Sequence, residues 1–291
     1  MSWLITGGAG QLGIALSKEL DKLGLAFNAL SSKDLDVTNE GIVNVLVSKL
    51  SPKVILNCAA WTDVDGAEVH EVQASRVNRD GAGYIALAAK NCNAKLIHLS
   101  TDYVFSGQGS TPWRVDGALD PQSAYGRTKA DGENRVLVAH PDGALILRTA
   151  WLYSPWGKNF AKSMTRLALN ASGQVPVVSD QVGQPTSAED LAKLIVELVL
   201  LGAPPGIYHG TNSGQATWFE FAQEIFRLAG ADVSRVVPIS SSAFGRAAKR
   251  PSYSVLSHDT LDHTPVWPMQ DWRIALAEAM PAIILAEKAR G

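Results

Sequence analysis

The sequence contains few residues of the kinds that build disulfide scaffolds or metal centres. Its two cysteines, Cys58 and Cys92, lie in apolar segments, and neither has a partner cysteine or histidine nearby. This excludes a disulfide-stabilised fold and a structural zinc site, and unpaired thiols fit a reducing cytosol. The six histidines are scattered, without the spacing of a metal-ligand pair. We therefore expect no bound metal.

The chain also lacks an excess of charge of either sign. Its 26 lysines and arginines nearly balance 28 aspartates and glutamates, and no basic run is present. Nucleic acid and anionic membranes are therefore not expected as partners. The most apolar stretch, 191–201, is short and contains two charged residues, and the first residues lack the basic start of a signal peptide. We expect a cytoplasmic protein.

What is present is a regular alternation of short apolar runs and helical patterns, in a chain of which 46% is hydrophobic. Most of the runs are followed directly by Gly, Ser or Thr, as buried parallel strands usually are. This order predicts an α/β fold, a Rossmann-type doubly wound parallel sheet with helices on both faces. The expected strands are Trp3–Thr6, Ala26–Leu30, Lys53–Asn57, Lys95–Ser100 and Ala144–Arg148. The expected helices between them are Gln11–Leu23, Asn39–Leu50, Val72–Asn91 and Tyr125–Ala139.

After about residue 150 the pattern loosens, and prolines and turn residues become frequent. We predict a dinucleotide-binding Rossmann domain over residues 1–150. Residues 151–291 should form mainly a smaller C-terminal substrate-binding lobe, with some elements returning to the main sheet. The helices expected in this lobe are Asn159–Leu169, Ser187–Leu201, Thr217–Ala229 and Asp271–Met280.

A glycine-rich turn follows the first strand and opens the first helix. Its glycines, Gly7, Gly10 and Gly13, would allow a tight turn and a close approach of backbone to a pyrophosphate. The phosphates would then lie on the free amides of the helix N-terminus. An ordinary strand-to-helix turn is the alternative, but the flanking strand and helix favour a dinucleotide site.

The end of the second strand lacks the carboxylate with which NAD-preferring sites hold the adenosine ribose. Ser31 is followed there by a second serine and by Lys33, and these groups could accept the 2′-phosphate of NADPH. NADPH is therefore favoured, with NADH possible, although an ordinary solvated loop would look the same. Asp36 and Val37 lie where an adenine contact is common, although Asp36 could equally belong to a helix N-cap.

Small residues end the third strand, where they would let a cofactor lie against the backbone. Ala59 and Ala60 are followed by Trp61 and then by the polar residues Thr62 and Asp63 at the expected mouth of the crevice. Close packing of a helix on the strand, with surface capping residues, is the alternative.

The fourth strand and the helix after it supply the groups that a carbonyl reduction needs. Tyr125 and Lys129 are four residues apart and therefore share one face of a helix. The ammonium group should favour the tyrosinate and lower the pKa of the phenol toward the working range. Tyr125 would donate the proton, and the hydroxyl of Thr101 would hydrogen-bond the same carbonyl oxygen.

Two residues farther along could contact the substrate. Trp151 follows the fifth strand and could stack on a sugar or a base, or it could be an ordinary core tryptophan. Arg250 could bring a cation to a diphosphate, and a structural salt bridge is the alternative.

Together these motifs resemble the extended short-chain dehydrogenase/reductase superfamily and, within it, the dTDP-4-dehydrorhamnose reductases. The resemblance covers nearly the whole chain. The segments that carry it are 10–13, 57–65, 100–105, 125–129, 148–151, 180–186 and 250–251.

The resemblance implies hydride transfer from NAD(P)H to C4 of dTDP-4-dehydro-6-deoxy-L-mannose, which gives dTDP-L-rhamnose. Tyr125 would be the proton donor, Lys129 would orient it and the nicotinamide ribose, and Thr101 would act on the carbonyl. The implied cofactor contacts are Gly10, Gln11, Leu12, Asp36, Val37, Ala59, Ala60 and Trp61. The implied nucleotide-sugar contacts are Thr101, Asp102 and Trp151, and we expect Thr62, Asp63, Tyr103 and Arg250 beside them.

Some members of this family bind Mg²⁺ at a dimer interface through a glutamate in the first helix. This chain has Ala15 there, so neither the metal nor that dimer is expected, and a monomer or another homodimer stays open.

Three rival functions share parts of this pattern. Nucleotide-sugar dehydratases need two acidic residues after the threonine, and Asp102 is followed here by Tyr103. Epimerases hold NAD tightly, which the strand end at Ser31 does not favour. A non-catalytic regulatory subunit, like the β subunit of methionine adenosyltransferase, would keep the same motifs, because a fold does not prove turnover.

Overall fold

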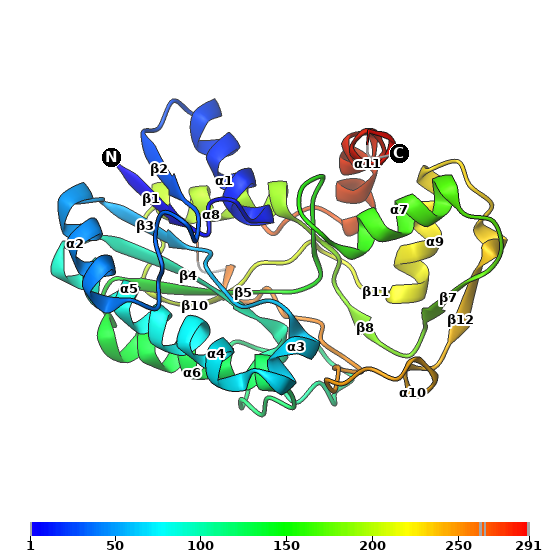
Figure 1. Cartoon of the computed structure of the whole chain (residues 1–291), viewed down its shortest axis with the longest axis horizontal. Helices are drawn as coiled ribbons and strands as arrows, with labels where there is room; N and C mark the ends of the chain where they lie inside the picture. Colours follow the sequence, from blue (N-terminus) through cyan, green and yellow to red (C-terminus); the bar gives the residue numbers. More distant parts are fainter. Residues whose placement is uncertain (1, 262–263, 265, 290–291) are drawn as a thin grey trace.

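A six-stranded parallel sheet is the main element of the computed structural model, which describes residues 2–261, 264 and 266–289 (Figure 1). The strand order is β2-β1-β3-β4-β5-β10, so β2 lies on one side of β1 and β3 lies on the other. Ligands of such sheets bind at the carboxyl ends of the strands, beside this point of reversal. The strands are β1 (Trp3–Thr6), β2 (Phe27–Leu30), β3 (Val54–Asn57), β4 (Lys95–Thr101), β5 (Ala144–Thr149) and β10 (Gly206–His209).

Helices cover both faces of the sheet, which explains why its central strands β1 and β3 are buried at every residue. Ile5 and Leu56 pack against α1 (Gln11–Lys22) and α8 (Ala188–Leu200) on one face. Leu4 and Ile55 pack on the other face. The helices of that second face are α2 (Glu40–Leu50), α5 (Ala82–Asn91) and α6 (Ala124–Ala139).

The second half of the chain forms a smaller group of elements beside the sheet, the second lobe (Figure 1). It also supplies β10 to the sheet and α8 to one of its faces. Aromatic and aliphatic residues, among them Phe221, Trp272 and Ile225, form the core of this group. Its helices are α7 (Phe160–Asn170), α9 (Trp218–Leu228), α10 (Ser241–Phe244) and α11 (Trp272–Lys288), with a 3₁₀ turn at Val233–Arg235. Its strands are β6 (Leu152–Tyr153), β7 (Val175–Val178), β8 (Val182–Gly183), β9 (Thr186–Ser187), β11 (Ala216–Thr217) and β12 (Val236–Ile239).

The prediction of one uninterrupted helix over Val72–Asn91 is wrong. The structure has α3 (Val64–Val69), α4 (Glu71–Ser75), a π-helical turn (Arg76–Gly81) and then α5. The π-helical turn contains Asn78, which is buried and hydrogen-bonded through its side chain. Wide turns of this kind are frequent at functional sites.

The last helix extends beyond its predicted end at Met280. The residue after that predicted end is Pro281, and proline lacks the N–H that continues a helix. In the structure α11 runs through Pro281 to Lys288, and Ile283 and Glu287 are buried against the second lobe. Packing of this face outweighs the lost hydrogen bond.

No helix of the described residues combines the length and the apolar character that crossing a bilayer requires.

Candidate active site

A cavity of about 860 Å³ opens at the carboxyl ends of β1, β3, β4 and β5, and the second lobe forms its far wall. The cavity brings together most of the residues singled out in the sequence. Those that line it are Gly7, Gly10, Gln11, Leu12, Gly13, Ser31, Asp36, Val37, Ala59, Ala60, Trp61, Thr62, Thr101, Asp102, Tyr103, Tyr125, Lys129 and Trp151. Asp63 and Arg250 are absent from this lining among the described residues.

The glycine-rich turn forms one end of the cavity. Gly7 has φ +65°, a conformation that favours glycine, and a Cβ on Gly13 would lie 2.5 Å from the Gly7 carbonyl oxygen. The N-cap of α1 is Gly10, which has no side chain to accept from the first amides of the helix. These amides are therefore open to an anion, as a cofactor pyrophosphate requires.

The end of β2 holds a carboxylate that was not identified from the sequence. Asp34 accepts hydrogen bonds from the Ser31 amide at 2.9 Å and from its hydroxyl at 2.6 Å. These bonds hold the pKa of Asp34 below its usual value. The next carboxylate, Asp36, accepts from the amide and hydroxyl of Thr38 at 2.9 and 2.8 Å. Both carboxylates organise the loop that would surround the adenosine ribose.

The π-helical turn fixes the backbone after β3. The Asn78 side chain accepts from the Trp61 amide at 2.8 Å and donates to the Trp61 carbonyl at 3.2 Å. It also donates to the Thr128 hydroxyl on α6 at 3.1 Å. Asn78 is thus a positioning residue that sequence reasoning missed. Asp63 is the N-cap of α3 and accepts from the Gly66 amide, outside the cavity.

Thr101, Tyr125 and Lys129 all line the cavity. The Lys129 ammonium is buried and donates to the Leu99 carbonyl at 2.5 Å. Burial lowers the pKa of Lys129 to about 8, although nearby Glu133 acts in the opposite direction. At neutral pH the side chain is therefore mainly charged.

The predicted lowering of the Tyr125 pKa is wrong in this structure. Burial raises the pKa of Tyr125 to about 12, while a hydrogen bond with Thr101 opposes the shift and Asp102 adds to it. The cause is desolvation of the tyrosinate, which the spacing of Tyr125 and Lys129 does not reveal. The phenol is consequently protonated at neutral pH, which is the state that a proton donor needs.

Asp102 and Tyr103 also line the cavity, next to Thr101 and Tyr125. The Asp102 carboxylate accepts from the Thr101 hydroxyl at 2.9 Å. Burial raises the pKa of Asp102 to about 6, and hydrogen bonds with Ser254 and Thr101 oppose the shift. The Tyr103 ring packs edge-on against Tyr125 with 5.5 Å between their centroids. It therefore restrains the orientation of the Tyr125 ring.

An aromatic wall closes the cavity on the side of the second lobe. Trp151 has φ +46° and stacks on Trp218 with ring centroids 3.5 Å apart. A Cβ on Gly183 would lie 2.5 Å from the Trp151 ring, so glycine is needed for this approach. Phe160 packs on Trp218 at 4.6 Å and lines the cavity with it. Trp218 and Phe160 had no sequence signal, because no motif surrounds them.

Arg250 takes the alternative role of a salt bridge. Its guanidinium lies 3.1 Å from the Asp65 carboxylate on α3, which also accepts from the Ala248 amide. The ion pair therefore connects the segment that contains Arg250 to α3.

No group of three or more His, Cys, Asp or Glu side chains suited to a metal ion occurs among the described residues.

The chain resembles known proteins over nearly its full length. A family model described as RmlD substrate binding domain matches residues 1–284. The chain is 46% identical over 285 residues to dTDP-4-dehydrorhamnose reductase of Streptomyces griseus, covering 97% of this chain and 93% of the relative. It is 45% identical over 288 residues to a probable dTDP-4,6-dihydroxy-2-methyloxan-3-one 4-ketoreductase of Streptomyces antibioticus, covering 99% and 97%. The structure of dTDP-4-dehydrorhamnose reductase from Bacillus anthracis in complex with NADP has a TM-score of 0.92 at 38% identity, covering 96% and 98%.

Proposed function

Because the chain belongs to the RmlD substrate binding domain family, we propose that it reduces the C4 carbonyl of dTDP-4-dehydro-6-deoxy-L-mannose with NADPH, giving dTDP-L-rhamnose. The observation that carries the proposal is that Thr101, Tyr125 and Lys129 line the same cavity that the open N-terminus of α1 borders. A proton donor and a dinucleotide site then share one cavity, as reduction of a carbonyl requires.

The residues present fit a bound dinucleotide. The uncapped amides of α1 suit its pyrophosphate, and the small side chains of Ala59 and Ala60 leave room along β3. NADPH supplies the hydride, and Lys129 would hold the nicotinamide ribose. The NADP-bound relative from Bacillus anthracis supports this choice of cofactor.

The chain's own residues supply the proton. Tyr125 is a neutral phenol at neutral pH and would donate its proton to the C4 oxygen as the hydride arrives. Thr101 would hydrogen-bond the same oxygen, and the Lys129 charge would stabilise the tyrosinate that remains. The edge of Trp151, with Asp102 and Tyr103, would hold the sugar.

We assign the two binding functions to different segments of the chain. Residues 1–150 would bind the dinucleotide, and residues 151–291 would mainly bind the nucleotide sugar. The aromatic wall of Trp151, Trp218 and Phe160 supports the second assignment, because all three residues belong to the later segment.

A second candidate is a 4-ketoreductase acting on another dTDP-sugar. The Streptomyces antibioticus relative supports it, because its identity of 45% is nearly that of the reductase from Streptomyces griseus at 46%. A dehydratase is less well supported, since Tyr103 stands where a dehydratase would place its second carboxylate.

Turnover by the purified protein tests the proposal. The chain is incubated with NADPH and a panel of dTDP-4-keto sugars, and product configuration is determined by NMR. We expect NADPH oxidation that is fastest with dTDP-4-dehydro-6-deoxy-L-mannose. Preference for another sugar would support the second candidate, and no oxidation with any would indicate a non-catalytic role.

The end of β2 gives a prediction about cofactor choice. We expect NADPH to be used at least as well as NADH, and Ser31→Asp to lower the NADPH/NADH ratio of kcat/KM by about tenfold. The added carboxylate would repel the 2′-phosphate, and ~1.4 kcal/mol of repulsion corresponds to that factor. Ser31→Asn, a neutral control of the same shape, should keep the wild-type ratio. A strong NADH preference in the wild-type enzyme would contradict the assignment.

A further inference from the structure

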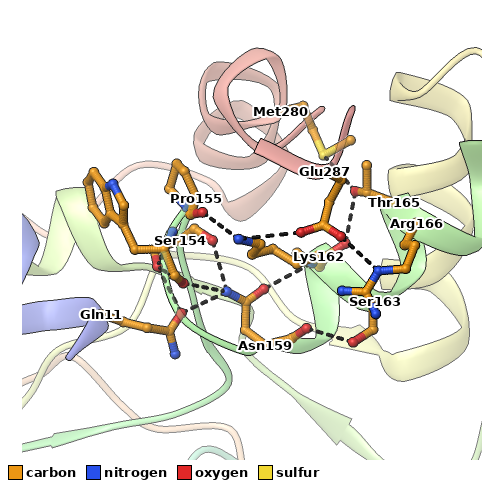
Figure 2. A network of polar contacts seen from close by, with 12 residues as sticks. Gln11, Ser154, Pro155, Asn159, Lys162, Ser163, Thr165, Arg166, Met280 and Glu287 are labelled. Carbon is orange, nitrogen blue, oxygen red and sulfur yellow. Dashed lines mark hydrogen bonds and ion pairs between the residues drawn. The ribbon is translucent and has the colours of Figure 1, made fainter. Parts of the chain in front are cut away.

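A loop of the second lobe is bound directly to the first turn of α1. This loop, residues 154–159, connects β6 to α7 (Figure 2). The side-chain oxygen of Gln11 accepts from the Ser154 hydroxyl at 2.9 Å and from the side-chain amide of Asn159 at 2.8 Å. A Cβ on Gly157 would lie 3.0 Å from Gln11 Cγ, so the loop backbone passes close to the N-terminus of α1.

The loop is anchored from its other side as well. The buried Lys162 ammonium donates to the Pro155 carbonyl at 2.7 Å and lies 3.4 Å from the Glu287 carboxylate (Figure 2). Glu287 belongs to α11 and also pairs with Arg166 at 2.9 Å. Asn159 caps α7 by accepting from the Lys162 amide at 3.0 Å. Both ends of the loop are therefore held by hydrogen bonds to other parts of the chain.

This fixed loop presents one cation to the cavity. Lys158 is exposed and lines the cavity, and it has no ion pair with any described residue. Lys129 is the other lysine or arginine of the described lining, and it is buried and bonded to the Leu99 carbonyl. Among the described residues that line the cavity, Lys158 is therefore the one cation available to pair with the diphosphate of a ligand.

We propose that Lys158, held by the clamp of Gln11, Ser154 and Asn159, pairs with the diphosphate of the dinucleotide at the N-terminus of α1. Under the proposed function the cavity would hold two diphosphates, one in the dinucleotide and one in the dTDP-sugar. The position of the loop favours the first. Gly157 and Asn159, on either side of Lys158, both lie against Gln11, the first residue of the helix whose open amides suit the cofactor. The inference rests on the proposed function and adds a cofactor contact from the substrate lobe.

Binding measurements on Lys158→Met test this pairing. The Kd of NADPH should rise about fivefold, as for a partly exposed charge pair, while the Kd of dTDP, measured with NADPH bound, should not change. The NADPH effect should shrink at high salt, because salt screens exposed charges. Lys158→Arg should restore most of the affinity.

Lys90→Met is the matched control, because it removes the same charge from an exposed position on α5 outside the cavity lining. Its NADPH affinity should equal that of the wild type, and melting temperatures should show that each variant is folded. Unchanged NADPH affinity in Lys158→Met would overturn the assignment. Weaker dTDP binding with normal NADPH binding would also overturn it, by placing Lys158 at the substrate's diphosphate.

These titrations need no turnover, so they separate the two proposals. Weakened NADPH binding in a protein that reduces no sugar nucleotide would support the Lys158 contact and refute the proposed activity.

Discussion

Replacing Tyr125 with phenylalanine should lower kcat by about 10²–10⁴-fold, the usual contribution of general acid catalysis. The ring and its edge-on contact with Tyr103 remain, so the substitution removes the proton source with little change in packing. NADPH and dTDP affinities should change little, because the lost hydroxyl acts mainly in the transition state. Steady-state kinetics and ligand titrations with the same preparation measure both effects.

Tyr208→Phe is the matched control for this experiment. Tyr208 is a largely buried residue of β10 outside the cavity lining, and its hydroxyl donates to the Pro204 carbonyl at 2.9 Å. We expect its kcat to equal that of the wild type. Near wild-type kcat in Tyr125→Phe would show that the proton comes from another group.

Replacing Arg148 with methionine should cost about 3–5 kcal/mol of unfolding free energy, the usual effect of breaking a buried ion pair. Arg148 and Glu133 are 1% and 2% exposed, and their charged groups lie 2.7 Å apart. Arg148 also donates to the Val115 carbonyl and lies 4.9 Å from the centroid of the Phe105 ring. The methionine would leave the Glu133 carboxylate buried without its partner. Urea denaturation monitored by circular dichroism measures the loss.

A second variant separates the cost of an unpaired charge from the worth of the pair. Adding Glu133→Leu to Arg148→Met removes the stranded carboxylate, and buried pairs replaced by apolar residues are often nearly neutral. The double variant should therefore recover much of the lost stability. A loss below about 1 kcal/mol in Arg148→Met would show that the pair behaves as a solvated one.

This ion pair also connects stability to the site. Glu133 lies one helical turn after Lys129 on α6, and Arg148 lies near the end of β5. The pair thus holds the helix that carries Tyr125 against the strand that leads to Trp151.

Much of the fold could be predicted because its signals are local. Each strand of the first half is a short apolar run, and residues that follow one strand must meet those that follow its neighbour at the same edge of the sheet. Gly7, Ala59 and Thr101 therefore line one cavity, as their positions at the ends of neighbouring strands predict, and Tyr125 joins them from the first turn of α6.

The features that were missed depend on contacts between distant segments. Trp218 stacks on Trp151 from another part of the chain, and Lys158 reaches the cavity because its loop is bound to Gln11. Asn78 is positioned by a π-helical turn inside what looks like a regular helix. The pKa of Tyr125 depends on burial, which residue spacing does not reveal.

Transfer of a labelled hydride tests the central claim most directly. The purified protein is incubated with dTDP-4-dehydro-6-deoxy-L-mannose and NADPH carrying deuterium at the transferable position, and the product is analysed by NMR. The account predicts one equivalent of NADPH oxidised per product, deuterium bound to C4 of the sugar and the configuration of dTDP-L-rhamnose. NADPH oxidation that leaves C4 without deuterium, or no oxidation at all, would contradict it.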